Sequence, residues 1–320
     1  MREIFAEIEG DLRAVEEEIS RVLQSPDGML TDAAIHLLRA GGKRLRPALA
    51  LLGGRFCDFS LPRVLPLAVA LELVHMATLI HDDVVDAAEV RRGIPTLRAS
   101  RGNRFSTYAG NYLFGRSLGL IAGYRDARVC RVLAETSMRM CLGELQQVCT
   151  AFDLSQTVRD YLYRIRYKTA LLIAASCDLG AYVCGAHRSV YLALFRYGYR
   201  IGMAFQITDD VLDLAADRRE LGKPIGGDLR QGIITLPVIY ALSRTRHPER
   251  LRELLLKREK TPEELEEAIA LITESGGLDY ARQMAQRFVA RAKAELRRLP
   301  DVSARAILYN VAEAIAARRF

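Results

Sequence analysis

Two short stretches of the sequence carry the same D-D-x-x-D spacing of aspartates, each at the end of a long apolar run. The first is "LIHDDVVD" at 79–86 and the second is "ITDDVLD" at 207–213. Their aspartates are Asp82, Asp83, Asp86, Asp209, Asp210 and Asp213. A carboxylate that leaves water needs a counter-charge or becomes neutral, so acidic residues next to a buried run require a partner.

The spacing itself indicates a metal site. The first and last aspartates of each motif are four residues apart, which places them on one helix face and ~5.4 Å apart along the axis. Two such carboxylates can share a hard divalent cation, and oxygen-only ligands suit Mg²⁺, which commonly bridges protein carboxylates to phosphates. The alternative is an acidic helix end, but negative charge there opposes the helix dipole. Two matching motifs favour the functional interpretation.

Basic segments accompany these motifs. "GGKRLRP" at 41–47 places Lys43, Arg44 and Arg46 after two glycines, in a turn whose amides and side chains could cradle a phosphate. An ordinary basic helix start is the alternative, and the spacing excludes a P-loop. Arg91 and Arg92 closely follow Asp86, so they are expected to neutralise whatever the aspartate-bound metals hold.

Other chemistries have little support. The sequence has no G-x-S-x-G elbow and no H-E-x-x-H, and His75 and His81 are six residues apart instead of four. His75 is either a core histidine or a substrate contact. Glu144 and Gln147 of "GELQQ" could face the same cavity, although lone polar residues on a helix usually face solvent or a neighbour.

The apolar periodicity predicts helices almost everywhere, and no stretch alternates long enough to predict a strand. The long helices are expected at about 2–24, 32–40, 45–58, 63–86, 103–123, 126–149, 156–184 and 188–214, with shorter ones from 234 onward. Thr261, Pro262 and Glu264 mark a helix start with a capping hydroxyl and a glutamate that reaches back. Glycine-containing connections at 87–102 and 215–232 each follow an aspartate motif.

Composition sets the remaining expectations. The chain has 320 residues, half of them apolar, and a net charge of +7. We predict one domain over 1–320, with the excess Lys and Arg on solvated helix faces and not on a nucleic-acid surface. The six cysteines form no C-x-x-C pair and no signal peptide is visible, which predicts a soluble, cytoplasmic protein with reduced thiols.

The motifs together resemble a known family. "GGKRLRP", the two aspartate motifs, "RRG", "GELQQ", "YKTA" and "LGKPIGGDL" occur in the order found in trans-isoprenyl diphosphate synthases, the polyprenyl synthetase family. The resemblance covers nearly the whole chain and is greatest to the long-chain enzymes. It implies an all-α, antiparallel helix bundle around a deep central cavity, with the two aspartate motifs facing each other across its mouth.

The resemblance also implies an activity. The enzyme would elongate an allylic diphosphate such as farnesyl diphosphate with isopentenyl diphosphate, giving a long all-trans product, heptaprenyl diphosphate, for the side chain of a quinone such as menaquinone. Its cofactor would be Mg²⁺, with about three ions in each active site. It would act as a homodimer or with a small regulatory subunit, with no nucleic acid and at most peripheral membrane contact.

Residue roles follow from the same resemblance. The metal ligands would be Asp82, Asp86 and Asp209, and all six motif aspartates, Lys168 and Lys223 would serve catalysis. Isopentenyl diphosphate would contact Lys43, Arg46, His75 and Arg92. The allylic diphosphate would contact Arg91, Lys168, Thr169, Gln206 and Lys223.

Product length is expected to depend on the residues below the first motif. Val74, Ala77 and Thr78 are modest or small, which indicates an open tunnel and a long product, although they could simply let helices pack closely. Asn111 departs from the family, which commonly has an aspartate there. The alternatives are a prenyl synthase of another product length (geranylgeranyl, hexaprenyl, octaprenyl), a terpene cyclase and a non-catalytic partner subunit.

Overall fold

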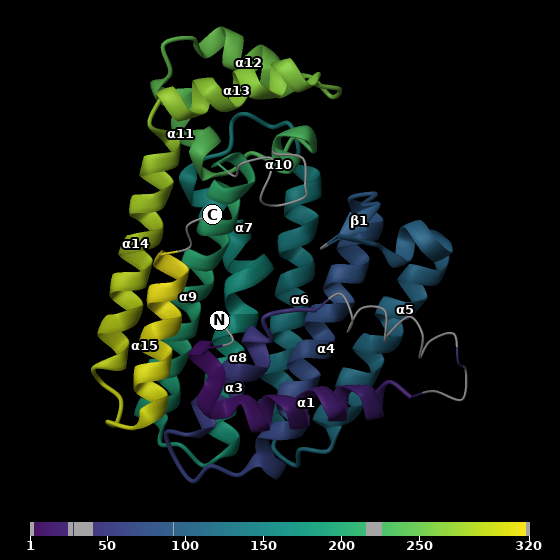
Figure 1. Ribbon diagram of the computed structural model, residues 1–320, viewed down its shortest axis with the longest axis vertical. Coiled ribbons are helices and arrows are strands. Elements are labelled where there is room, and N and C mark those ends of the chain that lie inside the picture. Colours follow the sequence, from purple (N-terminus) through teal and green to yellow (C-terminus); the bar gives the residue numbers. More distant parts are fainter. Residues whose placement is uncertain (1–2, 25–27, 29–40, 92, 216–225, 318–320) are drawn as a thin grey trace. The chain divides into compact units, whose positions relative to one another are not determined.

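The structure, a computed structural model, describes residues 3–24, 28, 41–91, 93–215 and 226–317 (Figure 1). Its elements in chain order are η1 (Glu3–Ile8), α1 (Glu9–Val22), α3 (Leu45–Gly54), α4 (Leu61–Val85), β1 (Val90–Arg91), β2 (Ile94–Pro95), α5 (Leu97–Ala122), α6 (Ala127–Cys149), α7 (Val158–Ile165), η2 (Arg166–Ala170), α8 (Leu171–Val183), α9 (Arg188–Ala215), α10 (Gly227–Arg230), α11 (Leu236–Arg244), α12 (Pro248–Leu256), α13 (Pro262–Glu274), α14 (Gly277–Leu296) and α15 (Ser303–Ala316). The expectation of an all-α protein is confirmed.

The chain forms two compact units. The first unit contains Met1–Ser137, Leu172–Phe195 and Leu296–Val311. The second unit contains Met138–Leu171, Arg196–Glu295 and Ala312–Phe320. The first aspartate motif therefore belongs to the first unit and the second motif to the second. One domain over 1–320 stays a prediction.

Three expectations about elements need correction. The helix expected at 45–58 ends at Gly54, because the chain then turns through a Cys57 N–H to Gly54 carbonyl bond. The two-residue strands β1 and β2 pair antiparallel, too short a hairpin for an alternation to reveal. The helix expected at 103–123 has a further turn before it, joined through Gly102 at φ 81°, a conformation that favours glycine. The expected helix 32–40 lies outside the described residues.

Helix α4 forms the core of the first unit and lies beside α5 (Figure 1). It is apolar and buried on nearly all sides, from Val64 to Ile80. Its length and composition would suit a membrane span, but 67% of its most apolar stretch is buried inside the protein. A helix that is hydrophobic all round and covered by its neighbours is a core helix, which is how we interpret α4.

A tyrosine compensates for the proline inside α4. Pro66 has no N–H and fixes the backbone in the second turn of the helix. At the next residue, the Leu67 N–H donates to the Tyr124 hydroxyl at 3.1 Å, and that hydroxyl donates to the Arg63 carbonyl. Tyr124 thus stands between the two backbone groups that an undisturbed helix would join directly.

Helices α3 and α8 approach each other so closely that only glycine fits at the contact. A Cβ atom on Gly180 would lie 2.0 Å from the Ala50 carbonyl oxygen, and one on Gly53 would lie 2.5 Å from the Cys177 carbonyl oxygen. Both obstacles are backbone atoms, which cannot rotate away. The missing side chains therefore set the distance between these helices.

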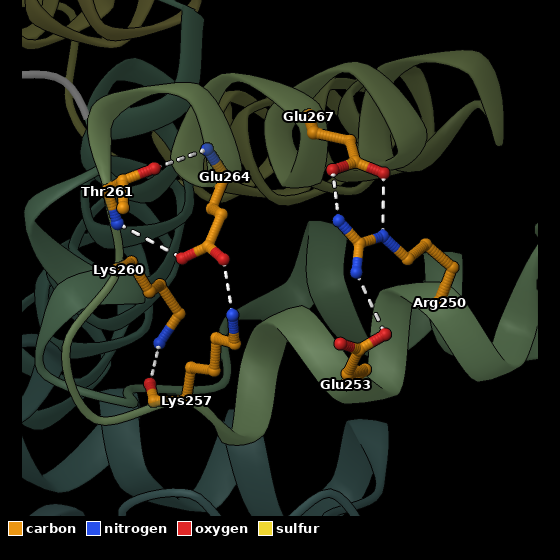
Figure 2. A network of polar contacts seen from close by, with 7 residues as sticks. All are labelled: Arg250, Glu253, Lys257, Lys260, Thr261, Glu264 and Glu267. Carbon is orange, nitrogen blue, oxygen red and sulfur yellow. Dashed lines mark hydrogen bonds and ion pairs between the residues drawn. The ribbon is translucent and has the colours of Figure 1, made fainter.

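In the second unit, ion pairs and a capping box join α12 to α13 (Figure 2). Arg250 makes two bonds to Glu267, at 2.8 and 2.6 Å, and Lys257 pairs with Glu264. The Thr261 hydroxyl accepts from the Glu264 N–H at 3.3 Å, and the Glu264 carboxylate accepts from the Thr261 N–H at 3.1 Å. The helix start predicted at Thr261 is confirmed.

We expect Gly180→Ala to lower the free energy of unfolding by about 1–3 kcal/mol, because the new methyl group must push α3 and α8 apart. Urea unfolding followed by circular dichroism measures this change as a lower midpoint at unchanged slope. Gly10→Ala is the control: Gly10 is exposed in α1 and has nothing within 4 Å of its Cβ position. That change should leave stability equal or up to about 1 kcal/mol higher. Equal midpoints for the two variants would contradict the close contact.

Candidate active site

In the first motif, the middle aspartate is buried and paired. Asp83 is 2% exposed, and its Oδ1 accepts a hydrogen bond from Arg91 Nε at 2.7 Å. Arg91 lies on β1, and the two ends of the hairpin are joined by a bond from the Thr96 hydroxyl to the Ala88 carbonyl at 2.7 Å. Arg91 is expected to neutralise whatever the aspartate-bound metals hold, and in the structure it is paired with Asp83 of the motif itself. Its contact with an allylic diphosphate stays a prediction.

Asp82 and Asp86 differ from Asp83 in being half-buried. They lie one turn apart at the C-terminal end of α4, and Asp86 is the C-cap residue of that helix. The spacing therefore separates two roles within the motif: Asp83 is turned to an arginine inside the protein, while Asp82 and Asp86 retain access to solvent.

A glycine on α5 fixes the neighbourhood of the first motif. A Cβ atom on Gly110 would lie 2.3 Å from Nε2 of His81, the residue before Asp82. A larger residue at 110 would have to displace the imidazole of His81. The next residue, Asn111, is exposed on α5, so the departure from the family pattern falls on a surface position of that helix.

The basic residues of the turn before α3 differ in their surroundings. Arg44, in the left-handed conformation at φ 46°, bonds Glu16 at 2.9 Å and the buried Glu72 at 3.2 Å. It therefore serves the protein itself, by neutralising a carboxylate on α4. Lys43 is exposed and Arg46 half-buried. These two are among the four residues predicted to bind isopentenyl diphosphate, and that role stays a prediction.

The predicted chain-length residues lie on α4, below the first motif. Val74 and Ala77 are each 1% exposed, whereas Thr78 is half-buried and its hydroxyl donates to the His75 carbonyl at 2.8 Å. His75 is also half-buried. Of the three predicted residues, Thr78 is the one whose side chain is partly open to solvent.

In the second motif the middle aspartate is again buried. Asp210 is 5% exposed, and it accepts hydrogen bonds from the Tyr161 hydroxyl at 2.7 Å and from Gln206 Nε2 at 2.8 Å. Burial raises the pKa of Asp210 to about 6, against the lowering effect of those two bonds and of the nearby Arg164. The Arg164 guanidinium is itself buried and bonds Gln156 and the Ile234 carbonyl, each at 2.7 Å.

The outer aspartates of this motif also differ from each other. Asp209 is half-buried. Both oxygens of Asp213 accept backbone N–H groups at the start of α10, from Gly227 at 3.0 Å and from Asp228 at 2.9 Å. Burial, followed by the Asp213 and Asp210 carboxylates, raises the pKa of Asp228. The metal-ligand set of Asp82, Asp86 and Asp209 stays a prediction.

A π-helical turn carries the predicted residues Lys168 and Thr169. The expected helix over 156–184 is present as α7 and α8, but the π turn η2 interrupts its α-helical bonding. Lys168 Nζ bonds Glu144 Oε2 at 2.7 Å and Gln147 Oε1 at 3.3 Å. The Thr169 hydroxyl donates to Gln206 Oε1 at 2.6 Å. Inserted π turns are frequent at functional sites.

Two glycines let the neighbouring helices reach this turn. A Cβ atom on Gly143 of α6 would lie 2.8 Å from the Lys168 amide nitrogen, and one on Gly202 of α9 would lie 2.6 Å from Ala170 Cα. Each glycine precedes residues that contact the turn, Glu144 in one helix and Gln206 in the other. Bonds from Thr169 through Gln206 and Asp210 to Tyr161 then connect the turn with the second motif.

Sequence reasoning missed three contributors to this site, namely Tyr161, Gly143 and Gly202. Gly143 could have been identified from the motif "GELQQ", because a glycine directly before the polar Glu144 lets another helix approach closely at that point. No local pattern identifies Tyr161. Two predicted residues, Arg92 and Lys223, lie outside the described residues, as does the terminal "ARRF" from Arg318 onward.

The chemistry of the available donors fits Mg²⁺. Among the residues that the structure describes, no three His, Cys, Asp or Glu side chains are grouped to hold a metal ion. Mg²⁺ does not require such a cage, because it keeps several waters and is usually bound by one or two carboxylates plus substrate phosphates. The half-buried Asp82, Asp86 and Asp209 provide carboxylate oxygens of this kind, whereas Asp83 and Asp210 are engaged by protein donors.

Comparisons with known proteins agree with one another. A family model described as polyprenyl synthetase matches residues 27–272. The chain is 44% identical to heptaprenyl diphosphate synthase component 2 of Geobacillus stearothermophilus, over 100% of this chain and 99% of that protein.

Two solved structures are similar over nearly their whole length. Heptaprenyl diphosphate synthase of Staphylococcus aureus has a TM-score of 0.92 at 34% identity, covering 98% of this chain and 99% of that one. A polyprenyl synthase of Caulobacter crescentus, complexed with calcium and isoprenyl diphosphate, has a TM-score of 0.94 at 34% identity, covering 99% and 97%.

We expect Tyr161→Phe to reduce the free energy of unfolding by about 1–3 kcal/mol, because a buried acceptor on Asp210 loses its donor. Urea unfolding at neutral pH measures the change. Tyr163→Phe is the matched control, since Tyr163 lies on the same helix and is 45% exposed. If both variants unfold at the same midpoint, the Tyr161 hydroxyl does not support the second motif.

Proposed function

Because this chain belongs to the polyprenyl synthetase family, we propose that it elongates an allylic prenyl diphosphate by successive condensation with isopentenyl diphosphate. The product is a long-chain all-trans polyprenyl diphosphate, and heptaprenyl is the length that the names of its relatives favour. One observation carries the proposal beyond the family match. In each D-D-x-x-D motif the middle aspartate is engaged by the protein and the first aspartate is partly open to solvent.

Substrate binding is proposed to divide the basic residues between two diphosphates. Isopentenyl diphosphate takes Lys43, Arg46, His75 and Arg92, and the allylic diphosphate takes Arg91, Lys168, Thr169, Gln206 and Lys223. Lysine contributes a point charge and arginine a planar fork, and both are suited to phosphate oxygens. Bound Mg²⁺, held by Asp82, Asp86 and Asp209, would neutralise charge that develops on the leaving diphosphate.

The chain's other residues protect and orient the reactants. An allylic cation survives only where water is excluded, and the apolar side of α4 below the first motif, with Val74, Ala77 and Ile80, is almost fully buried. Lys168 is oriented by Glu144 and Gln147, and Gln206 by Thr169 and Asp210. This reaction needs no protein nucleophile, in agreement with the absence of nucleophile motifs from the sequence.

The relatives named component 2 support a partner subunit. Helix α6 carries a face suited to one. Met138, Leu142, Leu145 and Val148 recur at helical spacing and are 62, 53, 59 and 55% exposed. A row of large apolar side chains in water marks a contact surface. We propose that another subunit, a second copy or a small partner, covers this face.

We propose a cytoplasmic location with at most peripheral membrane contact, and a quinone side chain such as that of menaquinone as the use of the product. The six cysteines are free thiols, as expected for a reducing compartment. The long apolar product accounts for the peripheral contact, since it must pass to a membrane after synthesis.

The direct test is to incubate the purified chain with Mg²⁺, farnesyl diphosphate and isopentenyl diphosphate, with and without an extract that supplies a partner. The product is then dephosphorylated and sized by chromatography. We expect a ladder that ends at a long-chain species. No extension in either condition would refute the proposal, and farnesyl diphosphate consumed without added units would instead indicate a cyclase.

Asp82→Ala and Asp209→Ala should each lower turnover by more than about 100-fold, because each removes a proposed metal ligand. Asp279→Ala is the control, since Asp279 is a 73% exposed carboxylate on α14. Unfolding midpoints of the three variants separate loss of chemistry from loss of structure. If the two motif variants unfold, the aspartates are structural and the assignment fails.

Thr78→Phe is expected to shorten the product, because an aromatic ring one turn below Asp82 would stop the growing chain. Thr78 is the appropriate site, since its side chain is half-buried, whereas a ring at the fully buried Ala77 would also disturb packing. Thr78→Val, which adds no length, is the control. An unchanged product ladder for Thr78→Phe would contradict a tunnel at this position.

Leu145→Glu should dissociate the assembly, because a charge at the centre of an apolar contact cannot be solvated. Size-exclusion chromatography with light scattering measures the mass. Glu249→Lys, which changes an exposed charge on α12, is the control. A Leu145→Glu protein of unchanged mass would show that this face is not the contact.

A further inference from the structure

Two cysteines that are far apart in the sequence meet in the first unit. Cys57 follows α3 and Cys184 follows α8, the two helices held together through Gly53 and Gly180. Both sulfurs lie close to Gly54: Cys57 Sγ is 3.2 Å from the Gly54 carbonyl oxygen, and a Cβ atom on Gly54 would lie 3.0 Å from Cys184 Sγ. Backbone geometry places them together as well: Cys57 Sγ lies 3.4 Å from the Ala181 carbonyl oxygen, which also accepts the Cys184 N–H at 3.1 Å.

The surroundings favour negative charge on one of the two sulfurs. The Cys57 thiol, the Ser60 N–H and the charge of Arg63 lower the pKa of Cys184 to about 7, against burial and Asp58. Ser60 is the residue that caps the start of α4, and helix starts are known to stabilise thiolates. The neighbouring Cys184 sulfur and burial raise the pKa of Cys57. Cys184 is therefore the more acidic of the two thiols.

Access to the pair comes through Cys57. Its side chain is half-buried, whereas Cys184 is 1% exposed. A small reagent can reach Cys57 first, and Cys184 lies directly behind it. The nearby Cys177 is fully buried and burial raises its pKa, so it is poorly suited to react.

We propose that Cys57 and Cys184 form a reactive dithiol that closes to a reversible disulfide when it meets an oxidised low-molecular-weight thiol. In the first step the Cys57 sulfur, its proton passed to Cys184, attacks the small disulfide, forms a mixed disulfide and releases one small thiolate. In the second step Cys184 gives up that proton to the released thiolate, attacks the Cys57 sulfur and expels the second small thiolate, which takes a proton from water. Starting from one thiol and one thiolate, the protein loses two electrons and one proton, the second proton comes from water, and the small disulfide becomes two thiols.

The bond would join the end of α3 to the end of α8, beside the start of α4. It closes a loop of more than a hundred residues, which restricts the unfolded chain far more than the native one. The oxidised protein should therefore have a higher thermal unfolding midpoint than the reduced one. This effect requires no substrate and is independent of the proposed prenyl transfer.

The test uses the full chain with Cys141→Ser and Cys149→Ser, because these two exposed thiols would otherwise react as well. Oxidised glutathione is added at neutral pH, and the products are analysed by intact mass and by peptide mapping. We expect a mass loss of about 2 Da, a Cys57–Cys184 cross-linked peptide, and reversal by a reducing agent. Closure should become faster as the pH rises through about 7, because the thiolate fraction rises.

Three controls make the result specific. Cys57→Ser and Cys184→Ser, added singly, should each abolish the loss of two hydrogens, whereas Cys130→Ser, which changes another half-buried thiol, should not. Phenylarsine oxide, which bridges two adjacent sulfurs, should bind the otherwise unchanged protein and protect both thiols from alkylation. A lasting glutathione adduct on Cys57 without closure, or a cross-link that survives in Cys184→Ser, would overturn the proposal.

Discussion

The candidate site depends on one constraint: each aspartate motif has a buried carboxylate near the C-terminal end of its helix, and that carboxylate needs a partner. The free energy cost is large unless a donor or a cation is supplied, and both aspartate motifs supply one to their middle residue. Asp83 has an arginine from a neighbouring hairpin, and Asp210 has a tyrosine and a glutamine. The first aspartate of each motif lies one residue before the middle one on the same helix and is half-buried.

Close backbone contacts supply the precision that these bonds need. Gly143 and Gly202 bring α6 and α9 against the π turn, and Gly110 brings α5 against His81 beside the first motif. In each case the contact is one residue away from a polar group of the site. Hydrogen bonds have a useful range of a few tenths of an ångström, so helices spaced by ordinary side chains would leave Gln206 short of Thr169.

Much of this arrangement follows from local patterns that the sequence displays. The all-α class, the ends of most helices, the capping box at Thr261 and the aspartate spacing depend on residues close together in the chain, where periodicity and capping rules apply. The partners of the buried groups do not. Tyr161 is 49 residues from Asp210, and nothing near either residue predicts their bond. Likewise, Arg44 and Arg46 look equivalent in "GGKRLRP", and the partners of Arg44, Glu16 and Glu72, each lie 28 residues away in the sequence.

The π turn at 166–170 has a consequence for how this region can change. An α-helix turns by about 100° for each residue. One extra residue in a π turn therefore rotates the side chains that precede the turn, about the helix axis, relative to those that follow it. Loss of a single residue there would leave the sequences of α7 and α8 on either side intact. It would, however, point the Lys168 ammonium to a different side of the helix. The motif "YKTA" lies within this π turn. The number of residues in the turn, as well as their identity, therefore sets the direction of the Lys168 side chain.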